Sequence, residues 1–242
     1  MTEKNIIWAS LIIGISLVIC VLTLRGTIAG FSSNNRLTVT GSSERLVSSD
    51  TAKWTITVTK KVTKAEDGPL AVEKDTALVN AFLQRNNFAK DQITLGQGQS
   101  TQVCVLSPQG YESCSLGVVA TNFTQTVIIE SADVKKVYDL QNIFSQELST
   151  INTSSSVEYY YNNLKNIRVE MLAEATKNAK ERAQSIAQAG GSKVGTIVAL
   201  SSGVFQVTAK NSVDVDNSGA YDTSTIEKKI TATVKADFSL SK

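Results

Sequence analysis

The sequence predicts an α+β protein with one N-terminal transmembrane helix. Runs of alternating apolar residues indicate strands, and apolar residues spaced three or four apart indicate helices. A third observation is an uncharged apolar segment over residues 6–24. About 210 residues follow it, enough to bury one core. We therefore divide the chain into residues 1–30, the membrane segment, and residues 31–242, one folded domain.

The N-terminal segment of 19 uncharged residues is long enough to cross a bilayer. As a helix it would span about 28 Å, close to the hydrocarbon thickness. A secretory signal peptide has a shorter apolar core before a small-x-small cleavage site, and only Thr27-Ile28-Ala29 approximates such a site. We expect an uncleaved signal anchor. Release of the domain after signal cleavage is the alternative.

Cys104 and Cys114 flank Ser107-Pro108-Gln109-Gly110, a turn signal between two strand-like runs. A hairpin folded symmetrically about Gln109 places the two cysteines opposite each other, with Cα atoms about 4.5 Å apart, which a disulfide can bridge. Two buried free thiols are the alternative. A disulfide agrees with an oxidising compartment, so we expect the N-terminus in the cytoplasm and the domain outside it.

The first half of the domain alternates strands and helices. Period-two runs predict strands over residues 37–39 and 51–62, and Asp67-Gly68-Pro69 starts a helix that should end near residues 86–87. Residues 93–106 and 118–130 then form the central hairpin.

Gly96-Gln97-Gly98 lies within the first strand of that hairpin. It lacks the third glycine and the helix start of a phosphate loop, so we interpret it as a bulge or bend.

A second helix follows, with Ser131 as N-cap candidate and apolar residues recurring to Leu148, and residues 157–161 supply its partner strand. Residues from about 51 to 162 therefore follow the order β-α-β-β-α-β. This is the order of a ferredoxin-like core.

The longest helix should start after Asn162-Asn163 and end near Ala189, where Gly190-Gly191 supply a left-handed C-cap. Its inward stripe is mostly alanine, which would let the helix lie close to a sheet. The stripe comprises Leu164, Ile167, Met171, Ala175, Ala179, Ala183 and Ile186. Residues 194–207 and 226–240 predict further antiparallel strands, separated by a polar loop.

The absence of histidine from all 242 residues excludes Ser-His-Asp and Cys-His catalysis and histidine-ligated metals. Ser-Lys and carboxylate-pair chemistry remain formally open, but no fingerprint marks them. We predict no enzyme, no metal site and no cofactor, and the sequence identifies no small-molecule ligand. Lys plus Arg number 24 against 22 for Asp plus Glu, so the chain has no basic field for nucleic acid.

Tyr159, Tyr160 and Tyr161 form the densest aromatic group. Strand alternation sends Tyr159 and Tyr161 to one face and Tyr160 to the other. Core packing explains at least one of them. An exposed tyrosine face at an oligomer interface is the alternative for the others.

Two blocks of sequence resemble the SIMPL-domain family. The first is Leu37-Thr38-Val39-Thr40-Gly41-Ser42-Ser43-Glu44 before the long strand, although the second glycine and the Pro-Asp pair usual there are missing. The second is the alanine-rich helix over residues 173–183, followed by Gly190-Gly191-Ser192-Lys193-Val194-Gly195. The resemblance covers roughly residues 36–240.

The resemblance implies a bacterial envelope protein without established enzyme activity, whose relatives include oxidative-stress-defence proteins and surface immunogens, some of them ring-like or channel-like oligomers. It carries over no catalytic residue. We expect a non-catalytic protein that is anchored in the bacterial inner membrane with its domain in the periplasm. It forms homo-oligomers and supports envelope integrity or stress tolerance. A ring-forming, channel-like or ligand-binding assembly is the alternative. An enzyme would need acidic or Ser/Lys residues clustered in one deep pocket.

Overall fold

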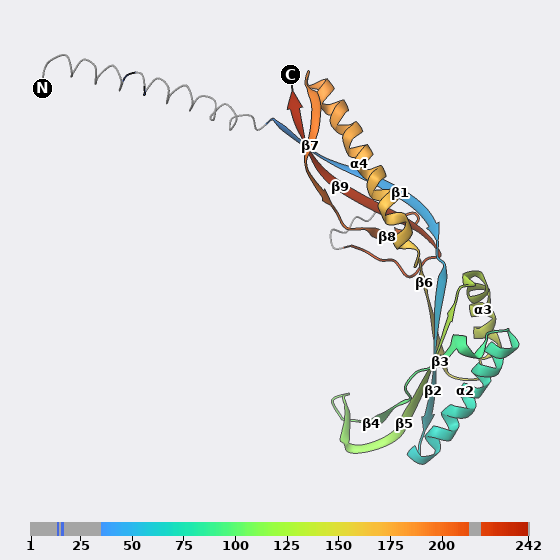
Figure 1. The fold of residues 1–242 in the computed structure, drawn as a ribbon. Helices are drawn as coiled ribbons and strands as arrows, with labels where there is room; N and C mark the ends of the chain where they lie inside the picture. The colour runs from blue at the N-terminus through green and yellow to red at the C-terminus, as the bar shows by residue number, and fades with distance from the viewer. Residues whose placement is uncertain (1–13, 15, 17–34, 213–218, 242) are drawn as a thin grey trace, which may run out of the picture. The chain divides into compact units, whose positions relative to one another are not determined.

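The computed structural model describes Gly14, Ser16, residues 35–212 and residues 219–241 (Figure 1). These residues form an α+β structure with helices α2, α3 and α4 and antiparallel sheets, as the sequence predicts. The predicted N-terminal membrane helix falls almost entirely outside them. Within the described part of the chain, no helix is both long and apolar enough to cross a membrane.

The chain divides into two compact units. The larger comprises residues 43–174 and 203–233, and the smaller comprises the remaining described residues, 35–42, 175–202 and 234–241. Strands β1 (Arg36–Ser48) and β9 (Glu227–Ser241) and helix α4 (Leu164–Ala189) contribute residues to both units.

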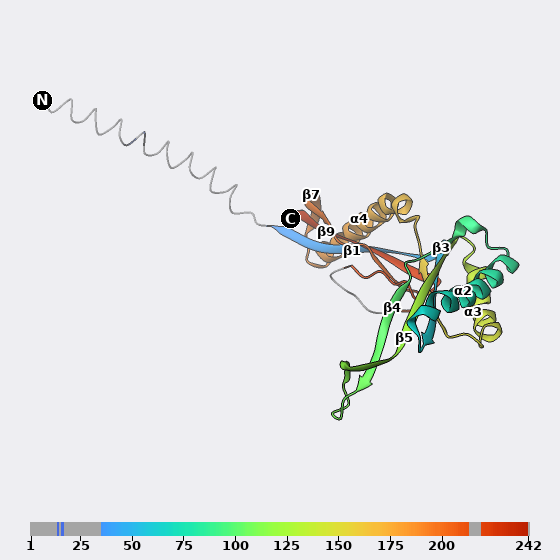
Figure 2. The same ribbon diagram turned by 90° about the horizontal axis from the view of Figure 1, so that it is seen from below.

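The larger unit contains a sheet of five strands with helices on one face (Figures 1 and 2). The order is β3-β5-β2-β6, and β4 also pairs with β5. The strands are β2 (Thr51–Val62), β3 (Ile93–Leu95), β4 (Gln99–Leu106), β5 (Glu112–Ser131) and β6 (Thr153–Tyr160), and the covering helices are α2 (Gly68–Arg85) and α3 (Val134–Glu147).

The core of this unit is built around Trp54 on β2. Strand alternation buries Trp54 completely, and its ring meets Phe144 of α3 edge-on at 5.3 Å, while Phe144 meets Phe82 of α2 at 5.4 Å. Burial of each such ring contributes about 1.5–3 kcal/mol. The three aromatic side chains therefore fix both helices against the sheet.

Helix α3 begins later than the sequence suggested, so the Ser131 N-cap prediction is wrong. Asp133 caps the helix by accepting the Lys136 N–H at 3.0 Å. Ser131 still belongs to β5, and its hydroxyl accepts the N–H of Asp133 instead. Pairing of β5 with β2 extends to this residue, which keeps its backbone extended.

The Gly96-Gln97-Gly98 segment is a bend, as predicted. It separates β3 from β4 along one edge of β5, and the Gly96 N–H donates to the Thr126 carbonyl at 2.8 Å. An added Cβ on Gly98 would come within 3.2 Å of the Gln125 side chain, so a small residue suits this turn.

The second sheet follows the order β1-β9-β7, with β7 (Lys193–Ser202) and β8 (Gln206–Ala209) both antiparallel to β9. The single strand predicted over residues 194–207 is therefore two strands, interrupted at Gly203.

The alanine stripe of α4 is confirmed where it meets these strands. Ala179 and Ala183 are fully buried with Val39, Ala236 and Phe238 in the smaller unit. Ile186 was wrongly placed in the stripe. It is 51% exposed, and the next residue, Ala187, is 4% exposed. The predicted left-handed C-cap is present at Gly191, where φ is 70°.

Candidate functional site

A two-stranded arm extends from the sheet of the larger unit. Pairing between β2 and β5 ends at Val62 opposite Thr121, whereas pairing between β4 and β5 continues to Leu106 opposite Glu112. Residues 103–120, which we call the arm, therefore have no third strand beside them (Figure 2). Both faces of the arm can be reached by solvent or by another molecule.

A disulfide joins Cys104 of β4 to Cys114 of β5 within the arm, with Cα atoms 4.7 Å apart. The disulfide closes a bulge on β5, because residues 114–117 lie between two consecutive cross-strand pairs and oppose no residue of β4. An isolated two-stranded hairpin is marginally stable in water. The cross-link therefore provides stability to the part of the sheet that lacks other support.

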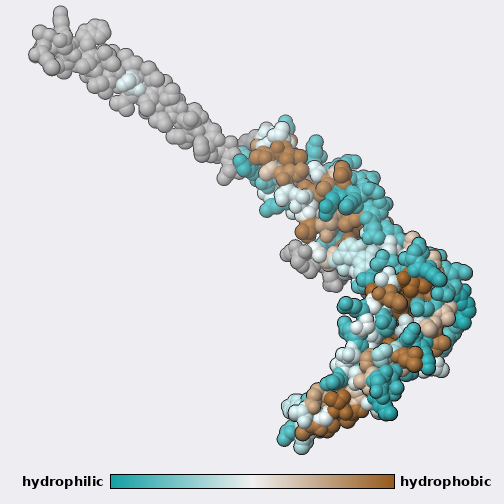
Figure 3. Space-filling model, turned by 60° about the horizontal axis from the view of Figure 1, so that its bottom comes forward, coloured by the Kyte–Doolittle hydropathy of each residue, from teal (hydrophilic) through white to brown (hydrophobic). Residues whose placement is uncertain are grey.

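The surface of the arm is apolar and almost uncharged. Figure 3 shows brown, apolar atoms exposed along it, at the lower end of the view. In residues 93–129 the only charged side chain is Glu112. The exposed fractions are 63% for Leu106, 75% for Tyr111, 56% for Leu116, 48% for Val118 and 49% for Val119. Exposed apolar side chains gathered on one element mark an interaction surface.

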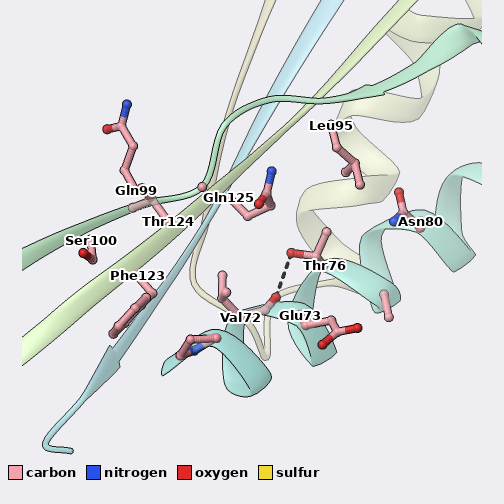
Figure 4. Close-up of a pocket in the computed structure, with 13 residues that line it drawn as sticks. Val72, Glu73, Thr76, Asn80, Leu95, Gln99, Ser100, Phe123, Thr124 and Gln125 are labelled. Carbon is pink, nitrogen blue, oxygen red and sulfur yellow. Dashed lines mark hydrogen bonds between the residues drawn. The ribbon is translucent and has the colours of Figure 1, made fainter. Parts of the chain in front are cut away.

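A groove of 560 Å³ lies beside the base of the arm, between α2 and the strands (Figure 4). Its lining combines apolar side chains with neutral amides and hydroxyls, and Glu73 is its one charged residue. The lining comprises Pro69, Val72, Glu73, Thr76, Ala77, Asn80, Leu95, Gly98, Gln99, Ser100, Phe123, Thr124 and Gln125.

Local hydrogen bonds occupy much of the polar lining. Thr76 donates to the Val72 carbonyl at 2.7 Å, and the Gln125 amide donates to the Gly96 carbonyl at 2.6 Å. The Asn80 Oδ1 atom is buried and has no hydrogen-bond partner among the described residues. The groove can accommodate an uncharged ligand by shape and by amide contacts.

The three consecutive tyrosines lie in different environments. Tyr159 is 5% exposed in the core of the larger unit, and burial raises the pKa of its phenol. The Tyr160 ring lies 6.3 Å from that of Tyr221, and Tyr161 packs against the cluster that contains Met171. The Tyr221 hydroxyl accepts the Tyr161 N–H at 3.0 Å. Their role at an oligomer interface stays a prediction.

Sequence reasoning missed a buried ion pair between Asp222 and Lys228. Lys228 is fully buried, and its ammonium group donates to the Asp222 carbonyl at 2.6 Å and to the Asp222 carboxylate at 3.2 Å. Burial alone would raise the pKa of Asp222, but hydrogen bonds from Ser224, Thr225 and Lys228 outweigh it and hold the pKa well below its usual range. No sequence signal pointed to this pair, because Asp222 lies within an ordinary polar loop and Lys228 lies at the start of the strand that follows.

Among the residues that the structure describes, no three Asp, Glu or Cys side chains are grouped as metal ligands. The groove and the arm each contain one charged side chain, Glu73 and Glu112, among neutral groups.

Comparison with known families gives one match. The model of the SIMPL family, described as a protein of unknown function (DUF541), matches residues 37–238. No curated protein matched the chain. The matched range includes the arm, the groove and both blocks of sequence that carried the resemblance. The chain belongs to the SIMPL family.

Proposed function

We propose that this SIMPL-family chain is a non-catalytic module of the bacterial envelope. Its N-terminal segment anchors it in the inner membrane, its folded part lies in the periplasm, and copies of it self-associate to support envelope integrity or tolerance of oxidative stress.

The arm carries the proposal. It exposes four large apolar side chains on two strands that lack a third, and Tyr111 in the turn between them. The arm contains one charge, so contact with another protein surface would remove apolar area from water at little electrostatic cost. Burial of a Leu or Val side chain contributes about 1.5–3 kcal/mol. Several such contacts suffice for specific association.

The non-catalytic part of the proposal rests on residue chemistry. The chain contains no histidine, and the groove holds a single carboxylate among neutral groups. General acid-base catalysis most often uses a histidine positioned near the substrate.

The location rests on two features. The 19-residue uncharged segment has the length of a membrane span, and the Cys104–Cys114 disulfide suits an oxidising compartment. The strand order of the larger unit also supports our interpretation of it as a ferredoxin-like core, since β2-α2-β3/β4-β5-α3-β6 has the order of a split βαβ unit.

Light scattering on the detergent-extracted full-length chain tests self-association. We expect a mass that is a multiple of 26.0 kDa, and we expect Leu116→Ser to lower it. Leu70→Ser is the matched control, because Leu70 is a leucine of similar exposure, 59%, on α2. A wild-type chain that stays monomeric contradicts the proposal.

The envelope role is tested separately in the source bacterium. Deletion of the gene should increase sensitivity to peroxide or to detergent, and wild-type protein should restore tolerance where Leu116→Ser does not. Unchanged tolerance of the deletion strain would remove the stress role.

The groove favours ligand binding as a second candidate function. Its 560 Å³ falls within the range of small-molecule sites. Native mass spectrometry of the purified chain should then show a retained molecule, and Ala77→Trp, which fills the groove from its exposed helical side, should abolish the added mass. No added mass in the wild type, or the same added mass in both proteins, would reject this alternative.

A further inference from the structure

Among the described residues, the two sheets have four outer sides, and three of them, at β1, β7 and β6, are protected. The edge strand β1 carries the charges of Arg36, Glu44 and Arg45. The β7 edge is irregular, because its register against β9 shifts twice. At β6, the Tyr159 N–H already donates to the Thr223 carbonyl at 2.7 Å. Charge, bulges and cover are the usual means by which proteins prevent sheets from pairing edge to edge.

The fourth edge, β4, has none of these features. It is eight residues long, Gln99–Leu106, and contains neither a charge nor a proline. Its register shifts against β5 come from extra residues on β5, so β4 itself runs without interruption. Within the described part of the chain, no strand other than β5 pairs with it.

The backbone groups of β4 that face outward can be assigned. The Ser107 N–H points toward β5, since it donates to the Tyr111 carbonyl at 2.7 Å. Because successive residues of an antiparallel strand direct their N–H and C=O groups to alternate sides, those of Gln102, Cys104 and Leu106 point away from β5.

We propose that β4 pairs antiparallel with β4 of a second copy of this chain, about a two-fold axis at or beside Gln102. The inference rests on the proposed self-association and names its surface. An antiparallel pair is self-complementary, so each copy offers the other the same row of donors and acceptors. The two strands lack charge, and no like charges oppose each other within the pair. The exposed side chains of Leu106 and Val118 then lie beside the new contact.

The size of the contact sets the expected affinity. An eight-residue strand is about 27 Å long, which makes the paired edge alone smaller than a standard protein interface. We therefore expect association that depends on chain concentration and that a shared membrane anchor would strengthen.

Opposite charges at Gln102 test the pairing. In a two-fold arrangement the side chains at this position lie opposite or diagonal to each other, so Gln102→Lys and Gln102→Glu each bring like charges together. We expect each variant alone to raise the dissociation constant of the pair by about two- to fivefold. An equimolar mixture of the two should restore association by attraction. Gln109→Lys and Gln109→Glu at the tip of the arm are the matched controls, because they change the charge equally outside β4.

Light scattering on the detergent-extracted full-length chain over a concentration series gives the readout, and circular dichroism verifies that each variant is folded. Restored mass in the Lys/Glu mixture supports the pairing. An oligomer unaffected by either Gln102 variant overturns this inference and leaves self-association through another surface. A monomeric wild-type chain at every concentration overturns the proposed function as well.

Discussion

Gly41 is the position at which one methyl group should disrupt the smaller unit. This residue of β1 crosses α4 so closely that an added Cβ would lie 2.2 Å from the Ala175 carbonyl oxygen and 2.4 Å from the Ala179 nitrogen. Real Cβ atoms essentially never come within 3.0 Å of such neighbours. Because both atoms belong to the helix backbone, no side-chain rotation can relieve the overlap.

Gly41→Ala must therefore separate β1 from α4 by about 1 Å, which loosens the contacts of Ala179, Ala183 and Phe238. Overpacking typically costs 1–3 kcal/mol, and the backbone location places this case at about 3 kcal/mol or above. For a folded part of this size the midpoint of thermal unfolding should fall by about 6–12 °C.

Thermal unfolding followed by circular dichroism measures the effect. Gly190→Ala is the control, since its added Cβ meets its nearest neighbours at an ordinary 3.6 Å and its φ is not positive. We expect little change for the control. A Gly41→Ala chain that unfolds within about one degree of wild type would show that β1 and α4 are not packed as closely as we describe.

Three further predictions concern the larger unit. Gly68→Ala places a Cβ 2.0 Å from the ring of Phe123, so it should push that ring toward the groove and lower the free energy of unfolding by about 1–3 kcal/mol, measured by urea titration. Asp222→Asn leaves the charge of the buried Lys228 unpaired and should lower the free energy of unfolding by about 3 kcal/mol. Lys228→Met should lower it less, because the Asp222 carboxylate keeps its hydroxyl donors. Because folding lowers the pKa of Asp222, its contribution to the free energy of unfolding is fully present above the ordinary carboxylate pKa and is lost as the pH falls through the lowered value. Wild type should therefore lose more stability in acid than Asp222→Asn. Parallel plots of stability against pH for the two proteins would contradict this. Cys104→Ser should increase hydrogen exchange in the arm and leave the core around Trp54 unchanged, and equal exchange in both proteins would show that the disulfide does not hold the arm.

Much of the fold could be predicted from local patterns. The period-two burial of Trp54, Ile56 and Val58 and the alanine stripe of α4 are visible in the sequence because strand and helix geometry repeat at fixed intervals. Errors arose at element ends. Ser131 has the chemistry of an N-cap, but strand pairing holds its backbone extended. Ile186 fits the helical period, but the residue buried at this end of α4 is its neighbour Ala187.

The candidate site was predicted only in part. The turn at Gln109 and the two flanking cysteines indicated a hairpin and a disulfide, because both depend on spacing along the chain. The hairpin extends beyond the end of β2, and this depends on where pairing between β2 and β5 stops, which is a tertiary property. The groove and the Asp222–Lys228 pair likewise join residues whose proximity arises only from packing.

The sequence by itself determined the class of this protein: its α+β elements, its SIMPL-family membership, the exclusion of histidine chemistry and the uncharged character of residues 93–129 save for Glu112. These properties are sums over residues or short-range periodicities. Only the tertiary structure decided which of the uncharged residues are exposed, because exposure depends on the strands and helices that lie beside each one. Among the described residues no strand lies beyond β4, and this absence, rather than any motif within β4, leaves the edge unpaired.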